Sequence, residues 1–184
     1  EWGHEVELIT SRTDSAGRSG WSTEIVDGIT VHYFSVPYNN RMGFLRRIKA
    51  FFSFAFFAAL KAASIKTDLV FATSTPLTIA LPGVYASRKL KVPMIFEVRD
   101  LWPEMPIALG VIKNPMLIWL ATKLELFAYK NSEHVIALSD DMARGVIRTG
   151  YSENDVTVVP NSCDLDLFDP ENACADRFRT KFDQ

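Results

Sequence analysis

The residues with the most chemical potential lie in the segment FEVRDLWPEMP, positions 96–106. An apolar, β-rich run at 92–98 leads into them, so Arg99, Asp100, Trp102 and Glu104 follow the carboxyl end of a predicted strand. Binding clefts of open parallel sheets form at that edge. An Arg beside an Asp can hold a sugar hydroxyl as donor and as acceptor, and a Trp ring offers a flat apolar face to a sugar. A surface ion pair beside a core Trp explains the same residue types, so types alone leave both interpretations open.

Small hydroxyl residues form a second candidate site in the segment ATSTPLT, positions 72–78. They end a predicted strand at 68–74 and lead into a helix predicted over 76–91. Thr73, Ser74 and Thr75 are predicted to cap that helix ahead of Pro76. The positive end of the helix would then face the cleft, where it suits a hydroxyl or an anionic oxygen. We therefore expect these four residues to bind substrate in addition to capping.

A third segment, 135–168, has the pattern of a strand, a helix and a strand. Ser139 is predicted to cap a helix at 140–149 that begins with two aspartates, and Gly150 is predicted to end it. Asn161 follows the second strand, where turn chemistry alone explains an Asn. We include Ser139 and Asn161 among the candidate substrate-binding residues.

Short apolar runs alternate with longer helical patterns along the chain, which predicts an α/β fold. We expect a Rossmann-like parallel sheet with helices on both faces. Asp27 and Gly28 are expected to form a tight turn, and 11–23 a polar loop. The predicted strands are 5–11, 26–36, 68–74, 92–98, 134–139 and 156–161, and the predicted helices are 44–66, 76–91, 115–131 and 140–149.

The overall composition excludes several classes of protein. A chain of 184 residues with 48% hydrophobic content suits one globular domain with a sizeable core. The net charge of −2 argues against nucleic-acid binding. Cys163 and Cys174 form no C-x-x-C pair, so neither a disulfide framework nor a zinc site is implied, and a reducing cytosol fits best. We expect no metal and no resident cofactor.

The three segments together resemble glycosyltransferase family 4, over essentially the whole chain. The resemblance is carried by FEVRDLWPE, by VIALSDDM, by Gly150, by DVTVVPNSCD and by Phe168. It implies one half of a two-domain GT-B architecture. The FEVRDLWPE segment is similar to that of bacterial transferases that build surface polysaccharides such as O-antigen or capsule, and it resembles fucosyl and N-acetylfucosaminyl transferases.

The resemblance also implies a reaction. A sugar would move with retention of its anomeric configuration from a nucleotide-sugar, held by a C-terminal domain, to an acceptor held by the N-terminal domain. Arg99 stands where many relatives have a histidine that contacts the donor sugar, and Asp100 is the neighbouring polar residue, so these two are the expected catalytic residues. An Arg cannot act as a base near neutral pH, so its role would be electrostatic. Ser162 and Cys163 depart from the usual Gly-Val.

The resemblance predicts that residues 1–184 are a single N-terminal domain without the donor domain, and that the fragment alone is inactive. An α/β fold of this kind normally begins with a strand, a turn and a helix ahead of a strand such as 5–11, so we expect that this first unit is lacking too. Two alternatives stay open: a nucleotide-sugar epimerase of related architecture, and a non-catalytic nucleotide-binding Rossmann module. The Leu-Trp-Pro-Glu segment speaks against the first and the absence of G-x-G-x-x-G against the second. Glu125 and Glu133 have the spacing of the family's donor-site glutamates, but their context favours surface charges.

The helix predicted at 44–66 could contact a membrane. Its eleven uncharged residues from Ala50 to Leu60 include five Phe, and a helix needs about 20 apolar residues to span a bilayer, so it cannot cross one. Arg46, Arg47 and Lys49 precede this run, at the helix end where basic residues oppose the dipole.

Anionic headgroups or a polyprenyl-pyrophosphate-linked acceptor would explain the basic residues, with Phe51 and Phe52 in contact with lipid. The alternative, burial of most of the Phe against the sheet, is the one that the pattern favours. The expected location is the cytoplasm, with peripheral attachment to the inner face of the cytoplasmic membrane as an option.

Overall fold

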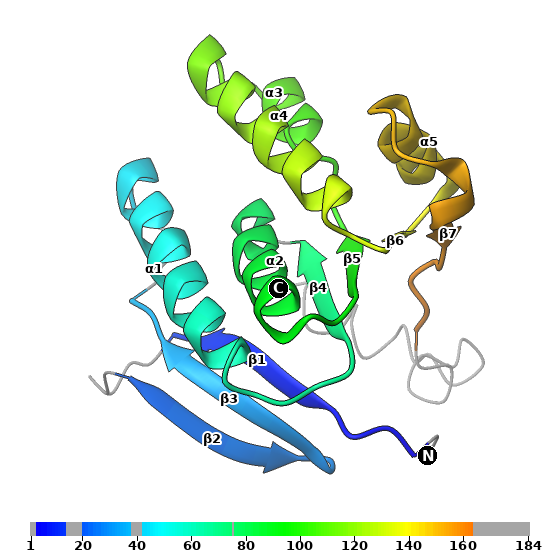
Figure 1. The fold of residues 1–184 in the computed structure, drawn as a ribbon. Helices are drawn as coiled ribbons and strands as arrows, with labels where there is room; N and C mark the ends of the chain where they lie inside the picture. Colours follow the sequence, from blue (N-terminus) through cyan, green and yellow to red (C-terminus); the bar gives the residue numbers. More distant parts are fainter. Residues whose placement is uncertain (1–2, 14–19, 38–41, 75, 164–184) are drawn as a thin grey trace, which may run out of the picture.

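The computed structural model describes residues 3–13, 20–37, 42–74 and 76–163. Its centre is a four-stranded parallel sheet in the order β4-β5-β6-β7, and helices connect successive strands (Figure 1). The predicted α/β fold is therefore confirmed. The strands are β4 (Val70–Ser74), β5 (Met94–Val98), β6 (His134–Ala137) and β7 (Val156–Val158).

The connecting helices match the predicted ones apart from their ends and one addition. The helix predicted from residue 76 starts later, because a 3-10 turn, Leu77–Ile79, intervenes. A five-residue helix after β5 was not predicted, since it is too short to show a period. The helices are α2 (Ala80–Leu90), α3 (Glu104–Ala108), α4 (Pro115–Lys130) and α5 (Asp140–Arg148).

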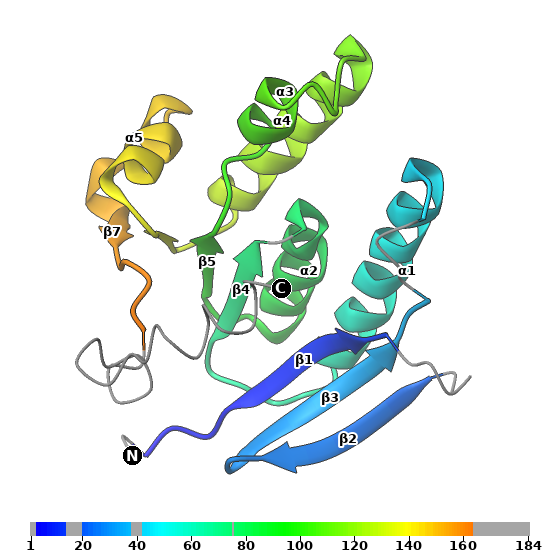
Figure 2. The ribbon, with the colours of Figure 1, turned by 180° about the vertical axis from the view of Figure 1, so that it is seen from behind.

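One core cluster joins the sheet to these helices. It includes Phe96 and Val135 from the strands, Val84 from α2, Tyr129 from α4 and Val146 from α5. Helices on both faces were expected. Within the described residues, α2, α4 and α5 share this one cluster, and Figure 2 shows β4 between β5 and α2. On the other face Phe71 of β4 is 52% exposed.

A second, three-stranded sheet has the order β1-β3-β2. β1 (Glu7–Arg12) and β3 (Ile29–Ser35) are parallel, while β2 (Trp21–Val26) and β3 form an antiparallel hairpin. Asp27 and Gly28 connect the hairpin with φ values of 50° and 81°, which confirms the predicted turn. The predicted loop at 11–23 is wrong at both ends, because Arg12 belongs to β1 and Trp21–Thr23 belong to β2. Every residue of β2 is exposed, so no alternating apolar face indicates this strand.

The helix α1 (Phe44–Ala62) packs beside α2 and contacts β1 and β3. Among the side chains of α1 that the structure describes, the buried ones are alanines, at positions 50, 55 and 58. Of the five Phe in the run 50–60 none is buried, and Phe52, Phe56 and Phe57 are exposed. The favoured prediction that most of them are buried is therefore wrong. Small alanine side chains bring the helix close to the sheet, which leaves the larger rings at its margins.

Candidate functional site

The carboxyl ends of β4 and β5 are joined by a side chain. The pairing of the two strands places Ser74 opposite Val98. Ser74 is 1% exposed, and its Oγ accepts a hydrogen bond of 3.1 Å from the backbone N–H of Arg99. Ser74 therefore holds the end of β5, and among the described residues the turn after Pro76 has no side-chain cap. Thr75 lies outside the described residues.

Three polar residues surround this link at the sheet edge. Thr73, at the end of β4, is exposed, as is Arg99, the first residue after β5. Asp100 is partly buried and makes contacts within the chain. Pro76 is partly buried where the chain enters α2. The structure thus brings Thr73, Arg99 and Asp100 to one edge, with Ser74 below them, as the sequence predicts.

Trp102 and Glu104 follow the same strand end and make contacts within the chain. Trp102 is partly buried and packs against the core cluster, which agrees with the core interpretation of this residue. Its peptide bond to Pro103 is cis. Glu104 begins α3, and its Oε1 lies 3.8 Å from the guanidinium of Arg148 on α5. Both side chains are well exposed, so this ion pair adds little stability.

The neighbouring strand ends bring in the remaining candidates. Ser139 is exposed, and its Oγ accepts a 3.3 Å hydrogen bond from the N–H of Met142, which confirms it as the cap of α5. Gly150, with φ of 91°, follows the end of the same helix as predicted. Asn161 is exposed, three residues beyond β7. Because all four strands are parallel, Thr73, Arg99, Ser139 and Asn161 lie along one edge of the sheet.

A buried carboxyl group was not predicted. Glu125 of α4 is 7% exposed, and its Oε1 accepts a 3.1 Å hydrogen bond from the hydroxyl of Tyr129. Burial raises the pKa of Glu125 to about 7, and the nearby charge of Glu104 adds to the effect. The prediction that Glu125 is a surface charge is therefore wrong, while Glu133 is exposed. Burial of Glu125 could have been predicted from its position in the apolar helical segment LELFAY, in which Tyr129 follows it by four residues and so lies on the same face of the helix.

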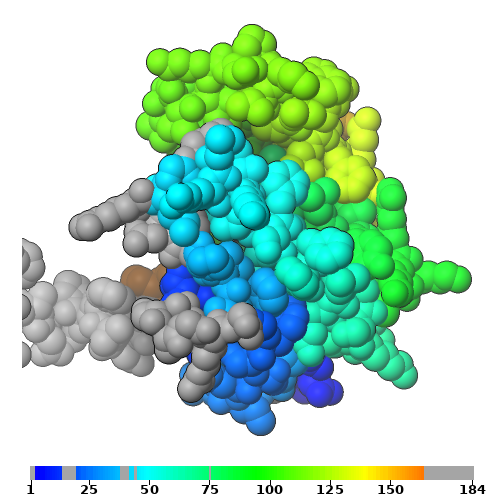
Figure 3. Space-filling model, turned by 90° about the vertical axis from the view of Figure 1, so that its left-hand side faces the viewer, coloured from blue at the N-terminus to red at the C-terminus, as the bar shows by residue number. Residues whose placement is uncertain are grey.

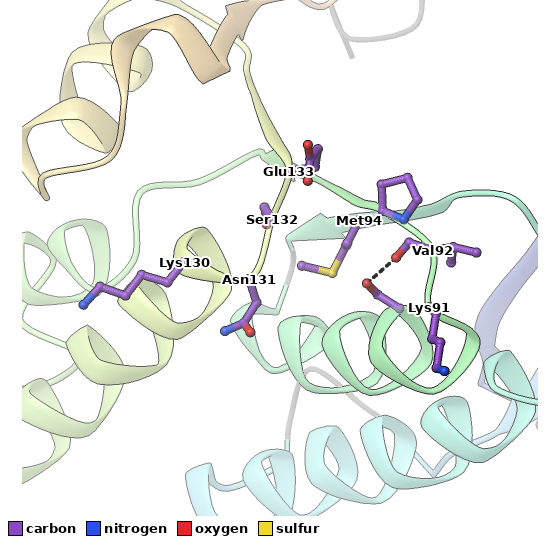
Figure 4. A pocket seen from close by; sticks show the side chains of 9 residues that line it. Lys91, Val92, Met94, Lys130, Asn131, Ser132 and Glu133 are labelled. Carbon is purple, nitrogen blue, oxygen red and sulfur yellow. Dashed lines mark hydrogen bonds between the residues drawn. The ribbon is translucent and has the colours of Figure 1, made fainter.

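A hollow of about 600 Å³ lies at the opposite, amino-terminal edge of the sheet (Figure 4). Two hydrogen bonds join residues that line this hollow. The N–H of Glu133 donates to the carbonyl of Met94 at 2.8 Å, and the Oγ of Ser87 donates to the carbonyl of Val92 at 2.6 Å. The side chains of Lys91 and Lys130 extend in different directions and do not point toward a common position. Clefts with chemistry form at the other edge of parallel sheets, so we do not assign the site here.

The part of the chain that the structure describes holds no group of three or more His, Cys, Asp or Glu side chains that could bind a metal ion. The described residues at the carboxyl edge of the sheet are hydrogen-bonding groups together with the cation Arg99 and the carboxylate Asp100. Such a set can orient hydroxyls and stabilise negative charge.

Fold and site together define an α/β domain with a polar edge at its parallel strand ends. The sequence profile of the glycosyl transferase 4-like domain matches residues 1–162, and the chain belongs to that family. The profile does not distinguish a fucosyl or N-acetylfucosaminyl subtype. No curated protein matches the chain.

Solved structures show the same fold. HepE of Anabaena in complex with UDP-glucose matches with a TM-score of 0.56 and 15% identity, over 96% of this chain and 50% of HepE. HepE with UDP and glucose matches with a TM-score of 0.53 and 15% identity, over 97% of this chain and 50% of HepE. This chain therefore spans about half the length of HepE. A UDP-N-acetylglucosamine 2-epimerase matches at a TM-score of 0.46, too weakly to bear on function.

Proposed function

We propose that this chain is the acceptor-binding part of a retaining glycosyltransferase that moves a sugar from a nucleotide-sugar to a lipid-linked glycan. Family membership supports the transferase class. The observation that carries the site is the Ser74–Arg99 link, because it fixes the ends of β4 and β5 beneath three polar groups.

In this site Arg99 supplies positive charge. As a cation it stabilises negative charge near the transferring sugar and does not act as a base. Thr73 and Asp100 orient acceptor hydroxyls by donating and accepting hydrogen bonds. Ser74 holds the backbone of Arg99, and so acts as a positioning residue. Ser139 and Asn161, at the next strand ends, extend the surface for a longer acceptor.

We propose that the nucleotide-sugar donor is held by a separate domain outside residues 1–184. HepE, whose structures contain UDP and glucose or UDP-glucose, supports this proposal because the present chain spans only half of it. The donor domain would close over the edge that carries Arg99. No metal is needed in this arrangement, since Arg99 provides the positive charge.

The helix α1 supports a lipid-linked acceptor and a peripheral position on the inner face of the cytoplasmic membrane. Arg46 and Lys49 are exposed at its amino-terminal end, as are Leu45 and Phe52. Two other residues of the expected membrane contact are less accessible. The Nε of Arg47 donates a hydrogen bond to the carbonyl of Met42 at 3.1 Å, and Phe51 is partly buried. Among the described residues no helix is long and apolar enough to span a bilayer. We place the reaction in surface-polysaccharide synthesis, on the sequence resemblance alone.

The test uses the full-length protein with a panel of nucleotide-sugars and a polyprenyl-pyrophosphate-linked acceptor. Arg99→Ala is expected to lower kcat/KM for transfer by about a hundredfold or more, since one preorganised charge is lost. Asp100→Asn is expected to raise the KM for acceptor more than that for donor. Lys130→Ala, a basic exposed residue near the amino-terminal edge, is the matched control. Unchanged transfer by Arg99→Ala would show that the site lies elsewhere.

A further inference from the structure

Large apolar side chains are exposed on a second helical surface, which neither the sequence analysis nor the proposed acceptor site includes. We call it the α3–α4 surface. It covers residues 105–120, from α3 through the following loop into the first turns of α4. Its members are between 37% and 70% exposed, and they are Met105, Ile107, Leu109, Val111, Met116, Leu117, Trp119 and Leu120. Isolated exposed apolar residues are ordinary, but a contiguous group marks an interaction surface.

The fold does not use these side chains. Helix α4 joins the protein core through Ala128 and Tyr129, in its last turns. In its first two turns every residue from 115 to 120 is exposed except Ile118, which is partly buried. Figure 1 shows this end of α4 extending beyond the sheet, on the side to which β4 and β5 point. Asn114 caps the helix through the N–H of Met116, at 2.9 Å, so the exposed turns are well-formed helix.

The charges around this surface are mostly positive. Glu104, which begins α3, is exposed, and its Oε1 lies 3.8 Å from the guanidinium of Arg148. Residues 105–124 include no Asp or Glu, and their two charged residues are the exposed Lys113 and Lys123. The Nζ of Lys123 lies 5.8 Å from the centre of the Trp119 ring. Residues 42–67, which contain α1, have five basic and no acidic residues. The whole chain has a net charge of −2, so its acidic groups are concentrated elsewhere.

The two basic, apolar helices face the same side of the molecule. Figure 3 shows the α3–α4 segment directly above α1 on one face. Both helices pack against α2, and in Figure 1 their amino-terminal ends lie toward the same end of the molecule. A flat partner could contact both at once.

We propose that the α3–α4 surface inserts into the headgroup region of an anionic lipid bilayer, with Trp119, Met116 and Leu120 as the inserted side chains. Trp favours the interface between headgroups and acyl chains, and the neighbouring lysines attract anionic lipid. Exposed lysines beside exposed apolar residues, with the adjacent carboxylate of Glu104 paired to Arg148, fit this partner. The bilayer contact then holds the strand ends next to the membrane, and it is independent of the glycosyl transfer proposed above.

The experiment is co-sedimentation of the full-length protein with vesicles of phosphatidylglycerol and phosphatidylcholine that contain no sugar and no acceptor. Met116→Glu with Trp119→Glu is expected to weaken vesicle binding by at least about tenfold, since two apolar insertions are lost. The control is Ile25→Glu on β2, which is 77% exposed and lies on the other sheet; it should bind as the unchanged protein does. Because no acceptor is present, a failed transfer assay leaves this result unaffected.

Tryptophan fluorescence gives a second measurement that does not depend on the folding of the double variant. Brominated lipids are expected to quench the emission of the unchanged protein, and Trp119→Phe should lose most of that quenching. No binding to anionic vesicles at low salt would overturn the proposal, as would equal binding by the double variant. A change of oligomeric state in the double variant, with vesicle binding retained, would assign the surface to a second copy and also overturn it.

Discussion

Ser74 and Glu125 are two buried polar residues, of which the first affects the geometry of the site and the second the pH dependence of stability. The Ser74 hydroxyl satisfies a backbone N–H at the end of β5 and so contributes to the geometry of the site. Glu125 is buried on α4, where it accepts a hydrogen bond from the Tyr129 hydroxyl, and this bond offsets only part of the loss of water. Its carboxyl group is therefore coupled to folding through pH.

Replacement of Glu125 by Gln should stabilise the protein at alkaline pH. The folded-state pKa is raised from 4.5 to about 7, so the folded chain holds a proton that the unfolded chain releases between these values. Stability is therefore lost as pH rises through this range, and the loss is complete above it. We expect Glu125→Gln to raise the free energy of unfolding by on the order of 2–3 kcal/mol at pH 8, and by little at pH 4.

Urea denaturation at pH 4, 6 and 8 measures this difference. Glu133→Gln removes an exposed carboxylate and is the control, with little change expected at any of the three values. A Glu125→Gln variant that is less stable than the unchanged protein at pH 8 would show that the carboxylate is stabilised in the fold.

At the scale of elements, the close approach of α2 to the sheet sets the position of the turn that precedes it. Gly83 lies at the contact: a Cβ there would be 2.8 Å from Sδ of Met94 and 2.9 Å from Cβ of Ala72. Atoms cannot approach so closely without a shift of helix or strand. The absence of a side chain at position 83 therefore allows α2 to cover β4 and β5 directly.

Gly83→Ala should consequently destabilise the protein, although Ala favours helices. Overpacking of this kind costs about 1–3 kcal/mol, which over most of that range exceeds the roughly 1 kcal/mol that Ala gains in a helix. Gly43→Ala is the matched control, since a Cβ at that position would have no neighbour within 4 Å and the residue's φ is −63°. Thermal and urea denaturation measure both variants. A more stable Gly83→Ala variant would mean that α2 and the sheet pack less tightly than described.

At the scale of the whole molecule, buried parallel strands were the most predictable part. The run VPMIFEV is largely apolar and flanked by helical patterns, so β5 and the position of Arg99 and Asp100 at its end could be predicted. The edge strand β2 could not, because all its residues are exposed. The bond between Ser74 and Arg99 joins residues 25 positions apart, and no local pattern indicates it. The packing of Trp102 in the core likewise depends on tertiary contacts.

Transfer of a sugar with retention by the full-length protein is the central claim, and one measurement tests it most directly. The full-length protein is incubated with labelled nucleotide-sugars and a polyprenyl-pyrophosphate-linked acceptor, and the lipid phase is analysed by NMR for the anomeric configuration of the new bond. We predict a labelled lipid-linked product whose configuration equals that of the donor. An inverted bond, or conversion of the nucleotide-sugar without any transfer, would contradict the account.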